Sequence, residues 1–151
     1  METSGILKKE WPSLVLLVYP FLFMLFAWNK LPAHIPVHWN FAGEADSFLD
    51  KEYEIFLMPL FNIGIWLFLL LLPRIDPRRR NYTSHPKAFR TIRLIVVCML
   101  VALNCISLCI ALGYNIDMVT TPYYLMLLLF LVLGNSIVNI RSNYFIGIRT
   151  P

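Results

Sequence analysis

The chain has 151 residues, of which 58% are hydrophobic and 15% are charged, and its formal net charge is +4. This length leaves no room for a second domain, and the longest hydrophilic segment, residues 29–54, is too short to form a water-soluble core of its own. In a soluble protein the positive charge would suggest nucleic acid as a partner. In so apolar a chain it is mainly a topology signal, so no direct nucleic-acid binding is expected.

Four hydrophobic stretches predict membrane-spanning helices. Each has 18 or 19 residues and contains no Lys, Arg, Asp, Glu or His. At about 1.5 Å per residue each covers roughly 27 to 29 Å, close to the hydrocarbon thickness of about 30 Å. The predicted fold is all-α, one membrane domain over residues 1–151 built as a bundle of four transmembrane helices. The predicted spans are Trp11–Trp28, Ile55–Leu72, Leu94–Leu112 and Tyr123–Ile140.

The basic residues predict the orientation of the bundle. Of the 13 Lys and Arg residues, only Lys30 and Lys51 fall in the loops 29–54 and 113–122. The positive-inside rule therefore places these loops outside and both termini, with the Arg-rich loop 73–93, in the cytoplasm. Within that inner loop, Arg78, Arg79 and Arg80 either serve topology alone or also contact anionic lipid headgroups.

The outer loop carries the most informative local pattern. Pro32 and Pro36 remove two backbone donors and favour extended or turn geometry, so the loop is not a simple helix. A turn is expected from Asn40 to Gly43, because Asn bonds its neighbouring backbone and Gly accepts positive φ. With Trp39 and Phe41 as apolar area to bury, we expect a folded cap that faces a partner.

Two histidines in this loop raise the question of a metal site. His34 and His38 stand four residues apart, with Glu44 and Asp46 as possible further ligands. Pro36 lies between the two histidines, and in an extended segment they would be about 13 Å apart, too far to share one ion. Structural or partner-contacting hydrogen bonds are therefore favoured, and no metal is expected.

The third span carries all three cysteines. Cys98, Cys105 and Cys109 share one helix face with Ala102. The outermost two would lie about 16 Å apart along the axis, too far to hold one ion, so the stripe favours close helix packing over a metal site.

Two motifs resemble those of a known family. The run Leu31 to Asp46 resembles a signature of a bacterial domain of unknown function found at the N-terminal end of SdpI-type membrane immunity proteins. The segment Gly134 to Pro151, an Asn-rich helix end running into Gly-x-Arg-x-Pro, is similar to the second signature of that family. Members generally continue beyond this point with further hydrophobic segments, so the chain is expected to be a short or truncated member.

The resemblance implies a multi-pass protein of a bacterial plasma membrane that protects the cell against a secreted toxic peptide. It also implies signalling, in which the toxin-bound protein holds a small transcriptional repressor at the membrane. The partners expected are thus membrane lipid, a toxin peptide outside and a repressor inside. The outer-loop candidates are Pro32, Pro36, His38, Trp39, Asn40, Gly43 and Asp46. The inner-face candidates are Asn135, Asn139, Arg141, Asn143, Gly147, Arg149 and Pro151.

Within the second motif, Asn135, Asn139 and Asn143 recur every four residues and would form one polar stripe if the helix continues that far. In a membrane such amides usually bond across to another helix, and Asn62 and Asn104 are the candidate partners. A direct binding role at the cytoplasmic end is the alternative.

No enzyme is expected, because the chain has no nucleophile elbow, phosphate-binding loop or metalloprotease motif, and no cofactor is expected either. The predicted spans lack the ionisable residues that a proton-coupled transporter needs. A small auxiliary or channel-like subunit of a transporter remains the alternative function, and the oligomeric state stays open.

Overall fold

The computed structural model describes residues 3–77 and 86–137. In this part of the chain, three helices are long and apolar enough to cross a membrane, and a fourth apolar helix is shorter. The helices are α1 (Thr3–Ala27), α2 (Lys51–Ile75), α4 (Pro86–Ala111) and α5 (Thr121–Ile137), and the strands are β1 (His34–Trp39) and β2 (Ala45–Asp50).

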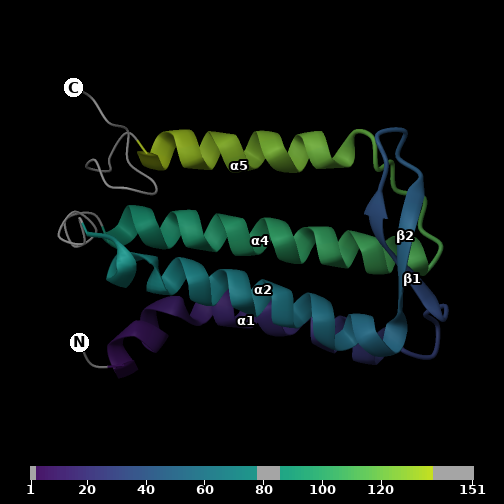
Figure 1. The fold of residues 1–151 in the computed structure, drawn as a ribbon, viewed down its shortest axis with the longest axis horizontal. Coiled ribbons are helices and arrows are strands. Elements are labelled where there is room, and N and C mark those ends of the chain that lie inside the picture. The colour runs from purple at the N-terminus through teal and green to yellow at the C-terminus, as the bar shows by residue number, and fades with distance from the viewer. Residues whose placement is uncertain (1–2, 78–85, 138–151) are drawn as a thin grey trace.

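The four helices lie side by side, and the two strands cover one end of the bundle (Figure 1). The beginning of α1, the end of α2, the beginning of α4 and the end of α5 lie at the opposite end. Helix α4 is central, because it packs against α1, α2 and α5. Within the described residues, α5 packs against α4 and makes no comparable contact with α1 or α2.

The all-α prediction was wrong in the outer loop. Strands β1 and β2 pair as an antiparallel hairpin, in which His34 lies opposite Asp50 and Trp39 opposite Ala45. The register is irregular on both sides of His38. Pro32 and Pro36 favour extended or turn geometry here, as predicted, but the pairing of the two extended segments with each other was not predicted.

The hairpin is folded onto the helix ends, as expected of a folded cap, whereas its contact with a partner stays a prediction. Ile35 of β1 is fully buried, and the hydroxyl of Ser107 on α4 donates a hydrogen bond to the Pro36 carbonyl. A core cluster joins the loop and strand to α1, α2 and α4; its buried members are Met24, Ala27, Leu31, Ile35, Ile55 and Leu108. A second cluster in the middle of the bundle contains Leu17, Trp66, Val97 and Val101.

Helices α1, α2 and α4 are longer than the predicted spans, and the added turns carry charge into the bundle. Helix α1 includes Glu10, α2 begins before Glu54, and α4 begins well before Arg93. All three of these side chains are buried. The predicted spans themselves contain no ionisable residue, as stated, but the helices that include them begin earlier and bury these three charged side chains.

The outward faces of the bundle are apolar. Large side chains such as Leu22, Phe26, Phe68 and Phe130 are exposed, as expected for helices that face lipid. The three cysteines are free thiols, and Cys105 packs against the second core cluster, in line with the predicted packing role.

Candidate binding pocket beneath the hairpin

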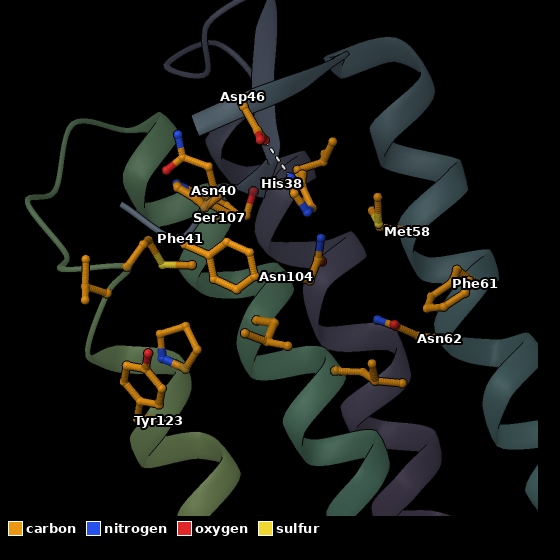
Figure 2. A pocket seen from close by; sticks show the side chains of 17 residues that line it. His38, Asn40, Phe41, Asp46, Met58, Phe61, Asn62, Asn104, Ser107 and Tyr123 are labelled. Carbon is orange, nitrogen blue, oxygen red and sulfur yellow. Dashed lines mark hydrogen bonds and ion pairs between the residues drawn. The ribbon is translucent and has the colours of Figure 1, made fainter. Parts of the chain in front are cut away.

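A pocket of about 700 Å³ lies beneath the hairpin (Figure 2). The hairpin contributes Val37, His38, Trp39, Asn40, Phe41 and Asp46, and the α4–α5 loop contributes Met118 and Val119. The helical lining comes from α2 (Met58, Phe61, Asn62), α4 (Leu100, Leu103, Asn104, Ser107) and α5 (Pro122, Tyr123). Because α2 and α5 do not pack closely against each other, the space in front of α4 stays open beneath the strands.

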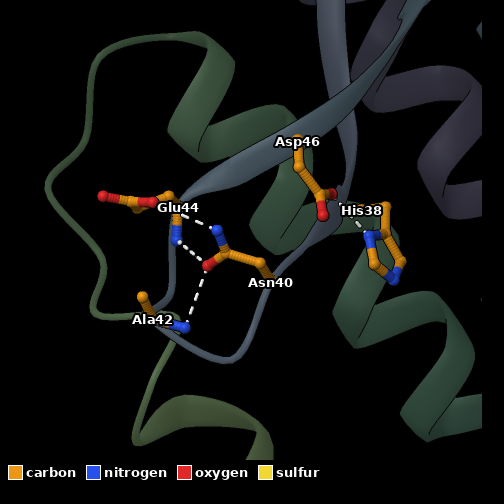
Figure 3. Close-up of polar contacts among 5 residues, drawn as sticks. All are labelled: His38, Asn40, Ala42, Glu44 and Asp46. Atoms are coloured by element: carbon orange, nitrogen blue, oxygen red, sulfur yellow. Dashed lines mark hydrogen bonds and ion pairs between the residues drawn. The ribbon is translucent and has the colours of Figure 1, made fainter.

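The roof of the pocket is ordered by the side chain of Asn40 (Figure 3). Its Oδ1 accepts hydrogen bonds from the backbone N–H of Ala42, at 2.9 Å, and of Glu44, at 3.0 Å. Its Nδ2 donates to the Glu44 carboxylate at 3.1 Å. Gly43 completes the turn with a positive φ of 78°. The predicted turn is confirmed, and one asparagine supplies most of its side-chain bonds.

Both histidines of the loop are used in cross-strand pairs. His38 Nδ1 lies 2.5 Å from Asp46 Oδ1, and His34 Nδ1 lies 2.7 Å from Asp50 Oδ1. Each pair joins β1 to β2, which agrees with the predicted hydrogen-bonding role. Among the described residues, no group of three His, Cys, Asp or Glu side chains is placed to hold a metal ion.

The hairpin tip rests against the α4–α5 loop at Gly43. A Cβ atom built at this position would lie 2.7 Å from Val119 Cγ2 and 3.2 Å from the Val119 backbone nitrogen. Only a residue without a side chain permits this approach, so Gly43 both completes the turn and fixes the roof over the start of α5.

The inner wall of the pocket carries buried polar groups. Asn104 Nδ2 donates to Glu54 Oε1 at 2.6 Å, and this bond links α4 to α2. Asn62 is only 3% exposed, and its Nδ2 has no hydrogen-bond partner among the described residues. Figure 2 shows the Asn62 side chain directed from α2 into the pocket. This amide group is thus a buried donor that the described protein groups leave unused.

The opposite end of the bundle contains a buried ion pair. Arg93 donates from Nε to Glu10 Oε2 at 3.0 Å and from Nη2 to Glu10 Oε1 at 2.5 Å. Its Nη1 also donates to the carbonyl of Leu69 at 3.4 Å. Arg93 is 8% exposed and Glu10 is 3% exposed. This bidentate contact joins α1 to α4 and touches α2.

The predicted outer-loop residues are brought together by the hairpin, and four of them line the pocket: His38, Trp39, Asn40 and Asp46. Gly43 lies at the tip, Pro36 is buried against α4, and Pro32 is exposed before β1. Of the predicted inner-face residues, only Asn135 is described, and it is exposed near the end of α5. Asn139, Arg141, Asn143, Gly147, Arg149 and Pro151 lie outside the described residues.

The pairing of Asn62 and Asn104 with the C-terminal stripe stays a prediction, because Asn139 and Asn143 lie outside the described residues. Asn104 bonds Glu54, and both amides line the pocket beneath the hairpin. Asn135 lies at the other end of α5, near Ile137. The two amides therefore belong to the half of the bundle that the hairpin covers.

The sequence analysis missed Glu10, Glu54 and Arg93 because they flank the apolar stretches. A weak signal was present. Each lies within four residues of a predicted span, and continuing the helix by one turn places it at the same depth as neighbouring core residues.

Two comparisons relate the chain to known proteins. Residues 15–63 match the family described as "Domain of unknown function (DUF1648)". The chain is also 28% identical over 148 residues to "Immunity protein SdpI" of Bacillus subtilis (strain 168), a match that covers 96% of this chain and 67% of that relative. No solved structure matches the chain. The matched domain includes β1 and β2, and the relative matches nearly the whole chain, so both comparisons agree with the resemblance to SdpI-type immunity proteins that the two motifs predicted.

Proposed function

We propose that this chain is a membrane immunity protein that gives resistance to a secreted toxic peptide by binding it in the pocket beneath the hairpin. The observation that carries the proposal is the pocket itself, which combines apolar walls from three helices with a roof built by the family's first motif. The name of the relative, an immunity protein, supports the same function.

The dimensions and chemistry of the pocket suit part of a peptide. Its volume of about 700 Å³ falls within the range of ligand sites, roughly 300–1,000 Å³, and accommodates a few side chains. Most of its lining is apolar, while Asn62 offers one unused donor. A short apolar segment with one backbone carbonyl directed at Asn62 would satisfy both features.

Access from the membrane supports the same ligand class. Helices α2 and α5 do not pack closely against each other within the described residues, so no helix contact closes the pocket between them. Phe41 is fully exposed yet lines the pocket, and Tyr123 at the start of α5 is also exposed. Aromatic side chains in such a position can bind an apolar peptide that has already partitioned into the lipid.

In this proposal the protein lies in a bacterial plasma membrane with the hairpin outside, where a secreted toxin arrives. The distribution of Lys and Arg supports this orientation. The opposite end, with the Arg-rich loop, would face the cytoplasm and hold a transcriptional repressor when toxin is bound. The protein acts by binding, and no catalytic step is proposed.

The test uses three variants in a strain exposed to the toxic peptide. Replacing His38, Trp39 and Asn40 together with alanine should abolish protection while membrane insertion is retained. Because this change also removes turn and cross-strand bonds, Phe41→Ala is the sharper variant, since Phe41 lines the pocket without holding the turn.

The matched control is Ser47→Ala with Phe48→Ala, two exposed residues of the same hairpin that do not line the pocket. Protection should fall in the Phe41 and triple variants and persist in the control. Full protection in the triple variant, with normal amounts of protein in the membrane, would overturn the proposal.

A further inference from the structure

A second, smaller cavity of about 260 Å³ lies between α1 and α4 at the end of the bundle opposite the hairpin. Lys9 and Ser13 stand one helical turn apart on α1, and Arg90 and Thr91 face them from α4. Trp11 lines the edge of the cavity. The cavity is thus bordered by two cationic side chains and two hydroxyl groups.

No salt bridge among the described residues neutralises the positive charge of this cavity. Within the described residues, neither Lys9 nor Arg90 takes part in a salt bridge. The nearest acidic residue along α1 is Glu10, and both of its carboxylate oxygens already accept hydrogen bonds from Arg93. That ion pair joins α1 to α4 beside the cavity, and so keeps Lys9 on α1 opposite Arg90 on α4. Because the Glu10 carboxylate is paired with Arg93, it does not neutralise Lys9 or Arg90.

The cavity lies at the boundary between the apolar and polar parts of the bundle. Lys9 lies two residues before Trp11, at which the predicted first span begins, and Leu94, which begins the predicted third span, also lines the cavity. Trp11 is 62% exposed, which suits an indole at the level of lipid headgroups. A ligand here would meet cations and hydroxyls on one side and hydrocarbon on the other.

We propose that this cavity binds the anionic headgroup of a phospholipid. The phosphate accepts hydrogen bonds from Lys9 and Arg90, and the Thr91 hydroxyl donates a further bond. One acyl chain of the lipid follows the apolar surface beside Trp11 and Leu94. A lipid with net negative charge is preferred over a zwitterionic one, because the cavity offers two cations and no free carboxylate.

Trp11 provides the readout. The full chain is reconstituted in phosphatidylcholine vesicles, and acyl-brominated phosphatidylglycerol or acyl-brominated phosphatidylcholine is titrated in while tryptophan quenching is recorded. The Trp11→Phe variant retains Trp28, Trp39 and Trp66, and its fluorescence is subtracted from that of the wild type to give the Trp11 signal. The wild-type Trp11 signal should be quenched at a lower mole fraction of the brominated phosphatidylglycerol than of the brominated phosphatidylcholine.

The variants separate a built site from general surface charge. Lys9→Gln and Arg90→Gln should each reduce the preference for phosphatidylglycerol by about fivefold, whereas Arg74→Gln, an exposed cation on α2, should leave it unchanged. The charge-conserving double variant Lys9→Arg/Arg90→Lys should retain most of the preference, which tests the site without loss of charge. If one of the two cavity Gln variants does not reconstitute, the other Gln variant and the charge-conserving double variant decide.

Three results would overturn the proposal. One is equal quenching by the two brominated lipids in the wild type. Another is an equal loss of preference in the Arg74 control and in the cavity variants. The third is displacement of the lipid by millimolar inorganic phosphate, which would show that the cavity recognises a free phosphate and not a lipid.

Discussion

A buried amide that lacks a hydrogen-bond partner destabilises the folded state, typically by about 1–3 kcal/mol. Asn62 is such a residue within the described part of the chain. Replacing it with Leu should therefore leave the free energy of unfolding unchanged or raise it by about 1 kcal/mol, while protection against the toxic peptide decreases. Thermal unfolding in detergent and cell survival, measured on the same variant, check the two halves of this prediction.

Asn104 is the matched control, because it is a pocket amide with a partner. Asn104→Leu leaves the buried Glu54 without its described hydrogen bond and should lower stability, the reverse of the Asn62 variant. If Asn62→Leu destabilises the protein as much as Asn104→Leu does, then the Asn62 amide has a structural role and is not a free donor for ligand.

Gly43 should be intolerant of any side chain. In Gly43→Ala, the left-handed backbone costs about 1–2 kcal/mol, and the new methyl group meets Val119. Hydrogen exchange of the hairpin amides should accelerate, and protection should fall. Combining it with Val119→Ala should restore only part of the exchange protection, because the backbone strain remains. Unchanged exchange in Gly43→Ala would contradict the close approach of the tip to the α4–α5 loop.

Among the contacts between helices, the ion pair of Glu10 and Arg93 joins α1 to α4. Arg93→Met leaves a buried carboxylate unpaired and should lower the free energy of unfolding by about 3–5 kcal/mol. Replacing Glu10 with Met as well should recover most of this loss, because two apolar side chains can fill the same space. Thermal unfolding of the two single variants and the double variant measures the coupling, with Arg74→Met as the exposed control. Additive losses would show that the pair does not hold α1 to α4.

The loop between α4 and α5 should respond to acid. The Thr120 hydroxyl and the Val119 N–H bond the carboxylate of Asp117 and lower its pKa. Its contribution to loop order is therefore present above the ordinary aspartate pKa of about 3.9 and is lost as the pH falls through the lower, folded-state pKa. Hydrogen exchange at Val119, corrected for its intrinsic pH dependence, should rise at strongly acidic pH in the wild type. In Asp117→Asn it should already be high at neutral pH.

For the whole molecule, the proposed orientation predicts opposite accessibility of two positions. On a background without Cys98, Cys105 and Cys109, a membrane-impermeant thiol reagent should label Ser47→Cys on the hairpin in intact cells. Ser84→Cys, which lies in the Arg-rich segment outside the described residues, should be labelled only after permeabilisation. The reverse pattern would place the pocket on the cytoplasmic side and rule out capture of a toxin from outside.

Much of the architecture could be predicted from local sequence. The four apolar stretches, the non-helical outer loop and the turn at Asn40 each depend on composition or on residues close in the chain. Local properties of this kind act before any packing, since span length follows from hydrocarbon thickness and two closely spaced prolines in a polar loop favour extended or turn geometry. The first motif likewise indicated residues that line the pocket, because it is one continuous segment.

The polar interior was decided by the tertiary structure. Glu10 meets Arg93 across 83 positions, Asn104 meets Glu54 across 50, and the tip of the hairpin meets Val119. A sequence shows that such residues flank or occupy the spans, but which helix faces meet depends on how α4 packs against its neighbours. What a buried charge or amide does depends on whether packing places a hydrogen-bonding partner next to it. The Glu10–Arg93 ion pair and the unpaired donor of Asn62 could therefore not be predicted from the sequence alone.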